Sequence, residues 1–130
     1  MITEDLVSFE VGKLLKQKGF DEPCRNVYEE KNLRTNTLCD YLNSELSSYV
    51  CAPTLQMAMK WLREVHHKYC DIGYDIDIQW FFHIIELKEL KEHFDYSELK
   101  YYHAENETGF NSYEEACEAA VKYCLKNLIK

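Results

Sequence analysis

The longest stretch of apolar residues at helical spacing covers residues 52–69, APTLQMAMKWLREVHHKY. Pro53 suits the first helical position, where its missing N–H costs nothing. The stripe consists of Leu55, Met59, Leu62 and His66, flanked by Ala58, Trp61 and Val65. Such a wide apolar face predicts a helix buried along much of its length. A core helix is the favoured interpretation, over a ligand groove or a partner helix.

Apolar and other residues alternate strictly in the segment after this predicted helix. Apolar residues occupy the even positions of residues 72–84, and Gly, Asp and Gln the odd positions of residues 73–79. This pattern predicts strand with one apolar face. One strand over residues 70–86 would be about 55 Å long, far beyond common strands. We therefore predict two strands joined near residues 75–78, with residues 80–87 as the better-buried second strand.

Both ends of the chain predict helices. Residues 3–18 have Thr3 as a cap and acidic residues in the first turn, and Gly19 fits a left-handed stop with Phe20 folding back onto the helix. Gly12 is a weak helical position that indicates a close approach to another element. Residues 113–129 follow a capping box of Ser112 and Glu115, with a stripe of Cys117, Val121, Cys124 and Leu128.

The remaining segments give weaker signals. Residues 25–29 and 38–42 are candidate short strands, residues 31–48 are otherwise rich in loop residues, and residues 49–51 should be extended before proline. Residues 87–94 indicate two turns of exposed helix, and residues 100–104 a third, edge strand. This order predicts an α+β fold with three helices packed on one face of a small, mainly antiparallel sheet.

Length and composition favour one domain over residues 1–130. The chain has 130 residues, 46% of them hydrophobic, which is enough for one core but not for two. It contains no apolar run of transmembrane length, and its first residues lack the order of a signal peptide. We therefore expect a cytoplasmic protein. Its six cysteines should then be reduced, and none shows C-x-x-C spacing.

The net charge of −8 is concentrated in one region. Residues 71–107 contain ten acidic residues against Lys88, Lys91 and Lys100. The strand-strand-strand-helix ending resembles double-stranded-RNA-binding domains in outline, but an acidic surface repels phosphate. We expect neither direct nucleic-acid binding nor membrane association.

Metal binding has one weak candidate. His66 and Cys70 are four residues apart and would share a helix face, with His67 adjacent, but further ligands would have to come from His83, His93 or His103. A histidine that interacts with the helix C-terminus is the favoured alternative. Asp75 and Asp77 could bind a hard cation, although solvated carboxylates are the usual case. Phosphate-binding, dinucleotide-binding and nucleophile motifs are missing, so the sequence indicates no cofactor.

Aromatic and acidic residues are interleaved in residues 71–107. Such a surface suits a basic protein partner, because tyrosine supplies contact area and charge steers encounter. Core packing is the competing explanation for the aromatic residues. The candidate partner-binding residues are Glu89, Glu92, Asp95, Tyr96, Glu98, Tyr101 and Tyr102.

Three phrases resemble a family of small uncharacterised proteins of Bacteroides-type bacteria and their phages and prophages. They are KLLKQKGFDEPC, YVCAPTLQMAMKWLREVH and NSYEEACEAAVKYCLKNLI. The resemblance implies an intracellular, phage-derived protein and supplies no residue roles. The leading hypothesis is a non-enzymatic binding or accessory module, as a monomer or homodimer, that meets a basic protein partner. The alternative is a small metal-dependent enzyme or metal-binding protein that uses His66 and Cys70.

Overall fold

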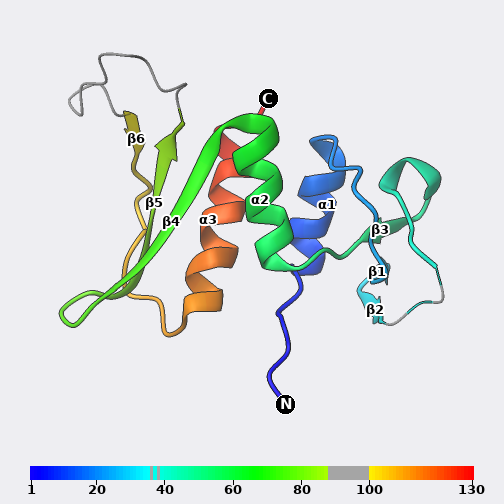
Figure 1. The fold of residues 1–130 in the computed structure, drawn as a ribbon, viewed down its shortest axis with the longest axis horizontal. Coiled ribbons are helices and arrows are strands. Elements are labelled where there is room, and N and C mark those ends of the chain that lie inside the picture. Colours follow the sequence, from blue (N-terminus) through cyan, green and yellow to red (C-terminus); the bar gives the residue numbers. More distant parts are fainter. Residues whose placement is uncertain (36, 38, 88–99) are drawn as a thin grey trace.

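The computed structural model describes residues 1–35, 37, 39–87 and 100–130, and it confirms the predicted α+β class (Figure 1). Its elements, in chain order, are α1 (Phe9–Gln17), β1 (Val27–Glu29), β2 (Asn32–Arg34), the short 3-10 helix η1 (Asn43–Glu45), β3 (Tyr49–Cys51), α2 (Leu55–His66), β4 (Lys68–Asp75), β5 (Gln79–Glu86), β6 (Lys100–Tyr102) and α3 (Tyr113–Asn127). Among the described residues, none of the helices is long and apolar enough to cross a bilayer.

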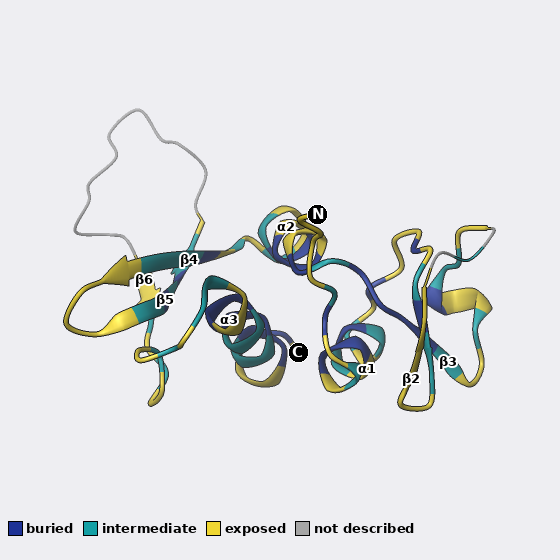
Figure 2. Ribbon diagram, turned by 90° about the horizontal axis from the view of Figure 1, so that it is seen from below, coloured by how far each residue is buried: buried dark blue, intermediate teal, exposed yellow. Residues whose placement is uncertain are grey.

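The strands form two antiparallel sheets, where the sequence predicted one. The sheet orders are β2-β1-β3 and β4-β5-β6, and the helices lie between the two sheets (Figure 1). Helices α2 and α3 pack against each other and against the β4-β5-β6 sheet, while α1 contacts α3 and β3. The core is therefore shared by all three helices and the inner face of the larger sheet (Figure 2).

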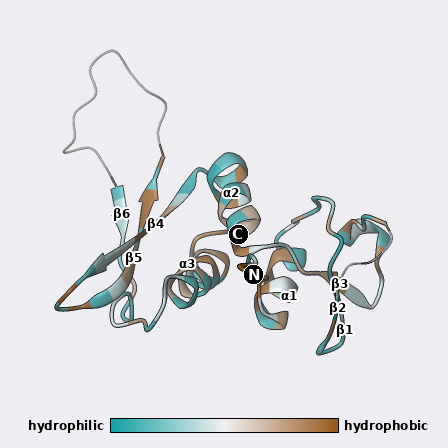
Figure 3. Ribbon diagram, turned by 60° about the horizontal axis from the view of Figure 1, so that its bottom comes forward, coloured by the Kyte–Doolittle hydropathy of each residue, from teal (hydrophilic) through white to brown (hydrophobic). Residues whose placement is uncertain are grey.

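The β4-β5 hairpin confirms the two strands predicted from alternation. The strands pair from Lys68 with Glu86 to Asp75 with Gln79, so the turn lies at residues 76–78. Phe82 and Ile84 are buried against the helices, but Ile76 at the free end is 84% exposed. The free end projects away from the helices (Figures 2 and 3), and it combines the exposed Ile76 and Ile78 with the exposed Asp75 and Asp77. The predicted apolar face is thus a core face only where the helices reach it.

The first helix is shorter than predicted, because tertiary pairing takes its first residues. Helix α1 begins at Phe9, after the cap residue Ser8, instead of at Thr3. Leu6 forms a β-bridge with Thr54, and the N–H of Leu55 donates to the carbonyl of Asp5 at 2.9 Å. This pairing satisfies the backbone without a helix and so overrides local propensity.

Two glycines, one within α1 and one just after it, have the roles predicted from the sequence. Gly19 has φ +93°, and the N–H of Phe20 donates to the carbonyl of Leu15 at 2.9 Å, so the left-handed stop is present. A Cβ at Gly12 would lie 3.1 Å from the carbonyl oxygen of Cys51. A larger residue at this position would therefore force β3 to shift away from α1 by a few tenths of an ångström.

Helix α2 is also shorter than its predicted range. It starts after the cap residue Thr54, so Pro53 precedes the helix instead of occupying its first position. It ends at His66, because His67 adopts φ +57° and stops the helix before Tyr69. The predicted stripe is buried except at two positions: His66 is half-buried and Val65 is 53% exposed.

Helix α3 closely matches its prediction. The side chain of Ser112 accepts a hydrogen bond from the N–H of Glu115 at 3.1 Å, while the Glu115 carboxylate accepts from the N–H of Asn111 instead of Ser112. Cys117, Val121 and Cys124 are fully buried.

The weaker predictions have mixed outcomes. Strands β1, β3 and β6 form within their predicted ranges, but β2 occupies a segment predicted as loop. In the predicted strand at residues 38–42, Tyr41 forms an isolated bridge with Cys24. Leu38 and residues 88–94 of the predicted exposed helix lie outside the described residues.

Candidate functional site

An open groove of about 700 Å³ lies between the N-terminal segment and α3. Pockets of this volume accommodate small ligands or the side chains of a partner. Its lining comes from both ends of the chain and from α2: Asp5, Leu6, Ser8, Leu55, Phe110, Ser112, Glu114, Glu115, Glu118, Ala119 and Lys122. A smaller neighbouring hollow of about 160 Å³ shares Asp5, Leu55 and Glu114 and adds Glu4.

Hydrogen bonds between the N-terminal segment and α3 shape the groove. The hydroxyl of Ser8 donates to a carboxylate oxygen of Glu118, and the N–H of Ser8 donates to the same oxygen at 3.3 Å. Ser8 also caps α1, so one residue fixes the helix start and the wall of the groove. Glu118 therefore joins segments that are 110 residues apart in sequence.

The groove is strongly acidic. Asp5, Glu114, Glu115 and Glu118 contribute carboxylates, and Lys122 is the basic residue in the lining. Lys122 pairs with Glu10 at 3.0 Å, and hydrogen bonds from Lys122 and Lys126 hold the pKa of Glu10 below its usual value. The lysine is thus already partnered. The carboxylates of the groove are left to attract a cation.

The floor of the groove is apolar. Leu55 is buried, and Leu6, Phe110 and Ala119 are half-buried beside it. Lysine and arginine side chains combine an apolar stem with a charged head. An apolar floor under a rim of carboxylates is therefore complementary to these side chains, more than to a phosphate or a neutral ligand.

The predicted partner-binding residues are only partly described. Glu89, Glu92, Asp95, Tyr96 and Glu98 lie outside the described residues. Tyr101 is exposed on the outer face of β6, as a contact residue should be. Tyr102 instead packs against the core, and its hydroxyl donates to Glu86 at 3.2 Å. The two tyrosines therefore belong to opposite faces of the sheet.

The side chains of the weak metal candidates, His66 and Cys70, lie in different surroundings. The His66 ring packs edge-on against Trp61, with ring centroids 4.6 Å apart. Cys70 lies on β4 instead of on the helix, and its Sγ is 4.0 Å from Sγ of Cys124 in the core. Since the helix ends before Cys70, the predicted four-residue spacing does not place the two side chains on one face.

His66 should make the protein less stable in mild acid. Its Nε2 is buried without a hydrogen-bond partner, and burial lowers the pKa of the imidazole, as do the charges of Lys68 and His67. In the unfolded chain the pKa is about 6.5, so below this pH the unfolded state takes up a proton that the folded state resists. The free energy of unfolding should therefore fall between about pH 7.5 and pH 5.5.

Urea unfolding of wild type and His66→Phe at both pH values checks this expectation. Phenylalanine retains an edge contact with Trp61 but does not titrate. The loss of stability at the lower pH should be smaller in His66→Phe than in wild type. Equal losses in the two proteins would show that His66 is not responsible.

Asp75 and Asp77 form part of the hairpin turn. The carboxylate of Asp75 accepts a hydrogen bond from the N–H of Asp77 at 2.8 Å. This contact is the one that aspartate commonly makes in turns. Both residues are exposed, which supports the solvated interpretation over a cation site.

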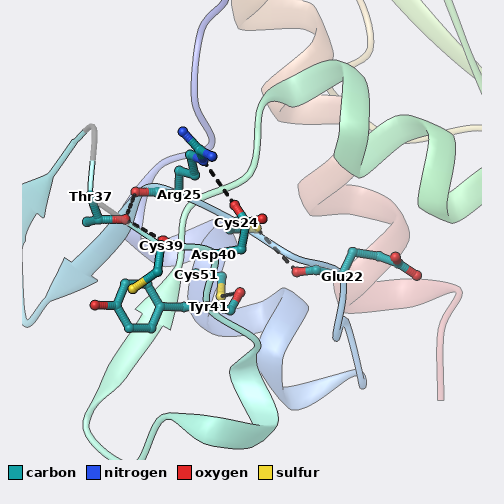
Figure 4. A network of polar contacts seen from close by, with 8 residues as sticks. All are labelled: Glu22, Cys24, Arg25, Thr37, Cys39, Asp40, Tyr41 and Cys51. Atoms are coloured by element: carbon teal, nitrogen blue, oxygen red, sulfur yellow. Dashed lines mark hydrogen bonds and ion pairs between the residues drawn. The ribbon is translucent and has the colours of Figure 1, made fainter.

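A polar network around Cys24 joins the segment before β1, and β3, to the loop before η1 (Figure 4). Cys24 and Tyr41 exchange backbone hydrogen bonds of 2.9 and 2.8 Å, and the Cys51 thiol donates to the Tyr41 carbonyl at 3.4 Å. The side chain of Thr37 in this loop donates at 2.6 Å to the carbonyl of Arg25, which precedes β1. The contacts are mainly to backbone groups, so the network ties Thr37 and Tyr41 to the segment before β1 and to β3.

Three of the buried thiols, those of Cys24, Cys70 and Cys117, are poor nucleophiles, whereas the hydrogen bond with Cys24 lowers the pKa of Cys51. A hydrogen bond with Cys51 and burial raise the pKa of Cys24, and contact with Cys124 and burial raise that of Cys70. Burial raises the pKa of Cys117 to about 11. Because the thiolate is the reactive form, these cysteines act as small core residues.

The groove escaped prediction because the acidic residues at each end of the chain indicate separate helix starts, and nothing in the sequence places the two ends side by side. The excess of charge in the sequence lies in residues 71–107, whereas the groove combines Asp5 with three glutamates of α3. The capping box accounts for Glu115 as the start of a helix, so the sequence gives no reason to place it in a site. The one available signal was the acidic first turn expected for residues 3–18, which in the folded chain lies beside the acidic start of α3.

Comparisons with protein-family models, with curated proteins and with solved structures find no match. The β4, β5, β6 and α3 order agrees with the strand-strand-strand-helix outline noted from the sequence. Agreement in order does not establish function. The hairpin turn carries Asp75 and Asp77, and the start of α3 carries Glu114 and Glu115, so these two surfaces would repel a phosphate backbone.

Proposed function

We propose that this chain is a non-enzymatic binding module for a basic protein partner. The observation that carries the proposal is the acidic groove, which places four carboxylates around an apolar floor. Asp5 and Glu114 form no ion pair within the described residues, and both side chains are exposed. They are therefore available to a lysine or arginine of a partner.

Electrostatic attraction defines the expected behaviour of this interaction. Exposed carboxylates steer a basic partner and speed its encounter, and salt screens them. An apolar floor adds contact area that salt does not weaken. The complex should thus form quickly at low salt and weaken, without vanishing, as salt increases.

The acidic, aromatic segment of residues 71–107 supplies a second surface for the same partner. Among the candidate partner-binding residues of this segment, Tyr101 is described and exposed. The resemblance to phage and prophage proteins extends the proposal: a phage-derived module of this charge would act as an acidic mimic that occupies a nucleic-acid-binding protein of the host. Such a role requires no catalytic residue.

Charge reversal of the groove tests the proposal. The variant Asp5→Lys/Glu114→Lys removes the two uncommitted carboxylates, and Glu22→Lys/Glu64→Lys makes the same charge change at exposed positions elsewhere. Each protein is used for affinity capture from host lysate at low and at high salt, followed by mass spectrometry. Circular dichroism confirms that each variant is folded.

We expect wild type and the control variant to retain a basic protein near stoichiometric amounts. The groove variant should retain at most about one tenth of the amount of this protein that wild type retains. Such a decrease corresponds to a loss of about 1.4 kcal/mol of binding free energy. A third variant reverses the charges of Glu89, Glu92, Asp95 and Glu98. Its retention of the partner measures the contribution of the second surface. Equal retention by all four proteins would overturn the proposal.

A further inference from the structure

Two histidines and a glutamate come together on the outer face of the larger sheet. They are His83 of β5, His103 just after β6, and Glu107 of the following segment. One ligand atom of each lies within 4.8 Å of the others. Nδ1 of His103 is 3.3 Å from one Glu107 oxygen, and Nδ1 of His83 is 3.9 Å from the other.

We propose that His83, His103 and Glu107 form a binding site for a divalent transition metal, with Zn²⁺ as the ion of choice. Imidazole nitrogen and carboxylate oxygen are ligands that Zn²⁺ binds at about 2.0–2.2 Å. Two ligands of a tetrahedral site are then roughly 3.3 Å apart. The His103–Glu107 separation already has this value, and small side-chain rotations would bring His83 to it.

The buried nitrogen of His83 gives independent support. Its Nδ1 is inaccessible to solvent and has no hydrogen-bond partner, since the Glu107 oxygen at 3.9 Å is too distant. A buried polar atom without a partner is costly. A metal ion placed between His83 and Glu107 would accept the nitrogen lone pair and remove that cost.

The backbone holds the three ligands in place. His83 lies within β5, next to Phe82, whose N–H donates to the carbonyl of Glu107 at 2.9 Å. The N–H of Ala104 donates to the Glu107 carboxylate at 3.3 Å and orients it toward the histidines. Positioning by a strand and by backbone hydrogen bonds suits a site whose geometry must be fixed.

Side chains on the same face support the rings. The His83 ring lies 5.1 Å from that of Phe81, and the His103 ring is stacked on Tyr101 at 6.4 Å. Asp71 is the ladder partner of His83 on β4, so its side chain lies on the same face of the sheet. Three protein ligands would leave one position for water.

Metal titration of protein made without a metal-affinity tag tests the site. The chain is stripped with a chelator and titrated calorimetrically with Zn²⁺, and Co²⁺ is added separately for its absorption spectrum. The ligand variants are His103→Ala, at an exposed side chain, and Glu107→Gln, which keeps an acceptor for the N–H of Ala104. His67→Asn is the matched control: it removes an exposed imidazole and suits the left-handed backbone there.

We expect about one equivalent of Zn²⁺, with each ligand variant weakening binding at least about tenfold and His67→Asn leaving it within about twofold. The Co²⁺ spectrum should lack a strong thiolate charge-transfer band. Less than about a tenth of an equivalent of bound Zn²⁺ would overturn the proposal. So would unchanged affinity in both ligand variants, or a thiolate band, which would place the ion on the cysteines. These readouts do not depend on the acidic groove.

Discussion

Replacing Phe82 with alanine is expected to lower the free energy of unfolding by about 3–5 kcal/mol. The Phe82 side chain is 1% exposed, and its ring lies 5.9 Å from that of Phe110 and 6.2 Å from that of Tyr123 on α3. Alanine would remove the apolar area and leave a cavity between sheet and helix that the two neighbouring rings could fill only in part. Urea unfolding followed by circular dichroism measures the loss.

The neighbouring residue supplies the control. Phe81 is on the outer face of the same strand, half-buried over Gly73, where a Cβ would lie 2.5 Å from its ring. Phe81→Ala should therefore cost less than about 1.5 kcal/mol, because its neighbours are Gly73 and the His83 ring on the outer face and not the core. If both variants lost the same stability, the assignment of inner and outer faces in β5 would be wrong. Phe82→Leu provides a milder change should the alanine variant fail to fold.

The alternation of apolar and polar residues in the β4-β5 hairpin was the best predictor of structure in the chain. A period of two requires a strand, and the length limit then requires a turn, so both strands and their connection followed from the sequence. Alternation could not tell how far the helices extend over the apolar face. Ile76 and Phe82 obey the same pattern, yet one is 84% exposed and the other 1%.

The N-terminal segment shows the opposite case, in which local signals were present but tertiary contacts prevailed. Thr3, Glu4 and Asp5 have the composition of a helix start, but the chain there pairs with the residues before α2. Backbone pairing with a distant segment has no signature in a local window. The acidic groove depends on this pairing, and so it could not be predicted either.

The candidate metal site was missed for a related reason. His83 and His103 were considered as additional ligands for His66 and Cys70, because the only spacing available from the sequence was the four-residue helical one. The structure separates His66 from Cys70 and brings the other two histidines to Glu107 through the β5-β6 pairing. Registers between strands join residues that spacing along the chain cannot connect.

Asn43→Ala is expected to lower the free energy of unfolding by about 2–5 kcal/mol, although it removes no apolar group. Asn43 is 5% exposed and links two elements: its Nδ2 donates to the carbonyl of Phe20 at 2.8 Å, and its Oδ1 accepts from the N–H of Cys51 at 2.9 Å. Alanine would leave a buried donor and a buried acceptor unpaired. Each such group costs about 1–3 kcal/mol. Urea unfolding measures the difference from wild type.

Two further variants separate hydrogen bonding from packing. Asn43→Leu has a similar size but cannot pair with either backbone group, so it should be at least as destabilising as alanine if the hydrogen bonds dominate. Ser44→Ala, at the exposed neighbouring position in η1, should stay within about 0.5 kcal/mol of wild type. A leucine variant as stable as wild type would contradict the assignment, because it would show that Phe20 and Cys51 do not need a polar partner. The end of α1 and β3 would then be held together by apolar packing alone.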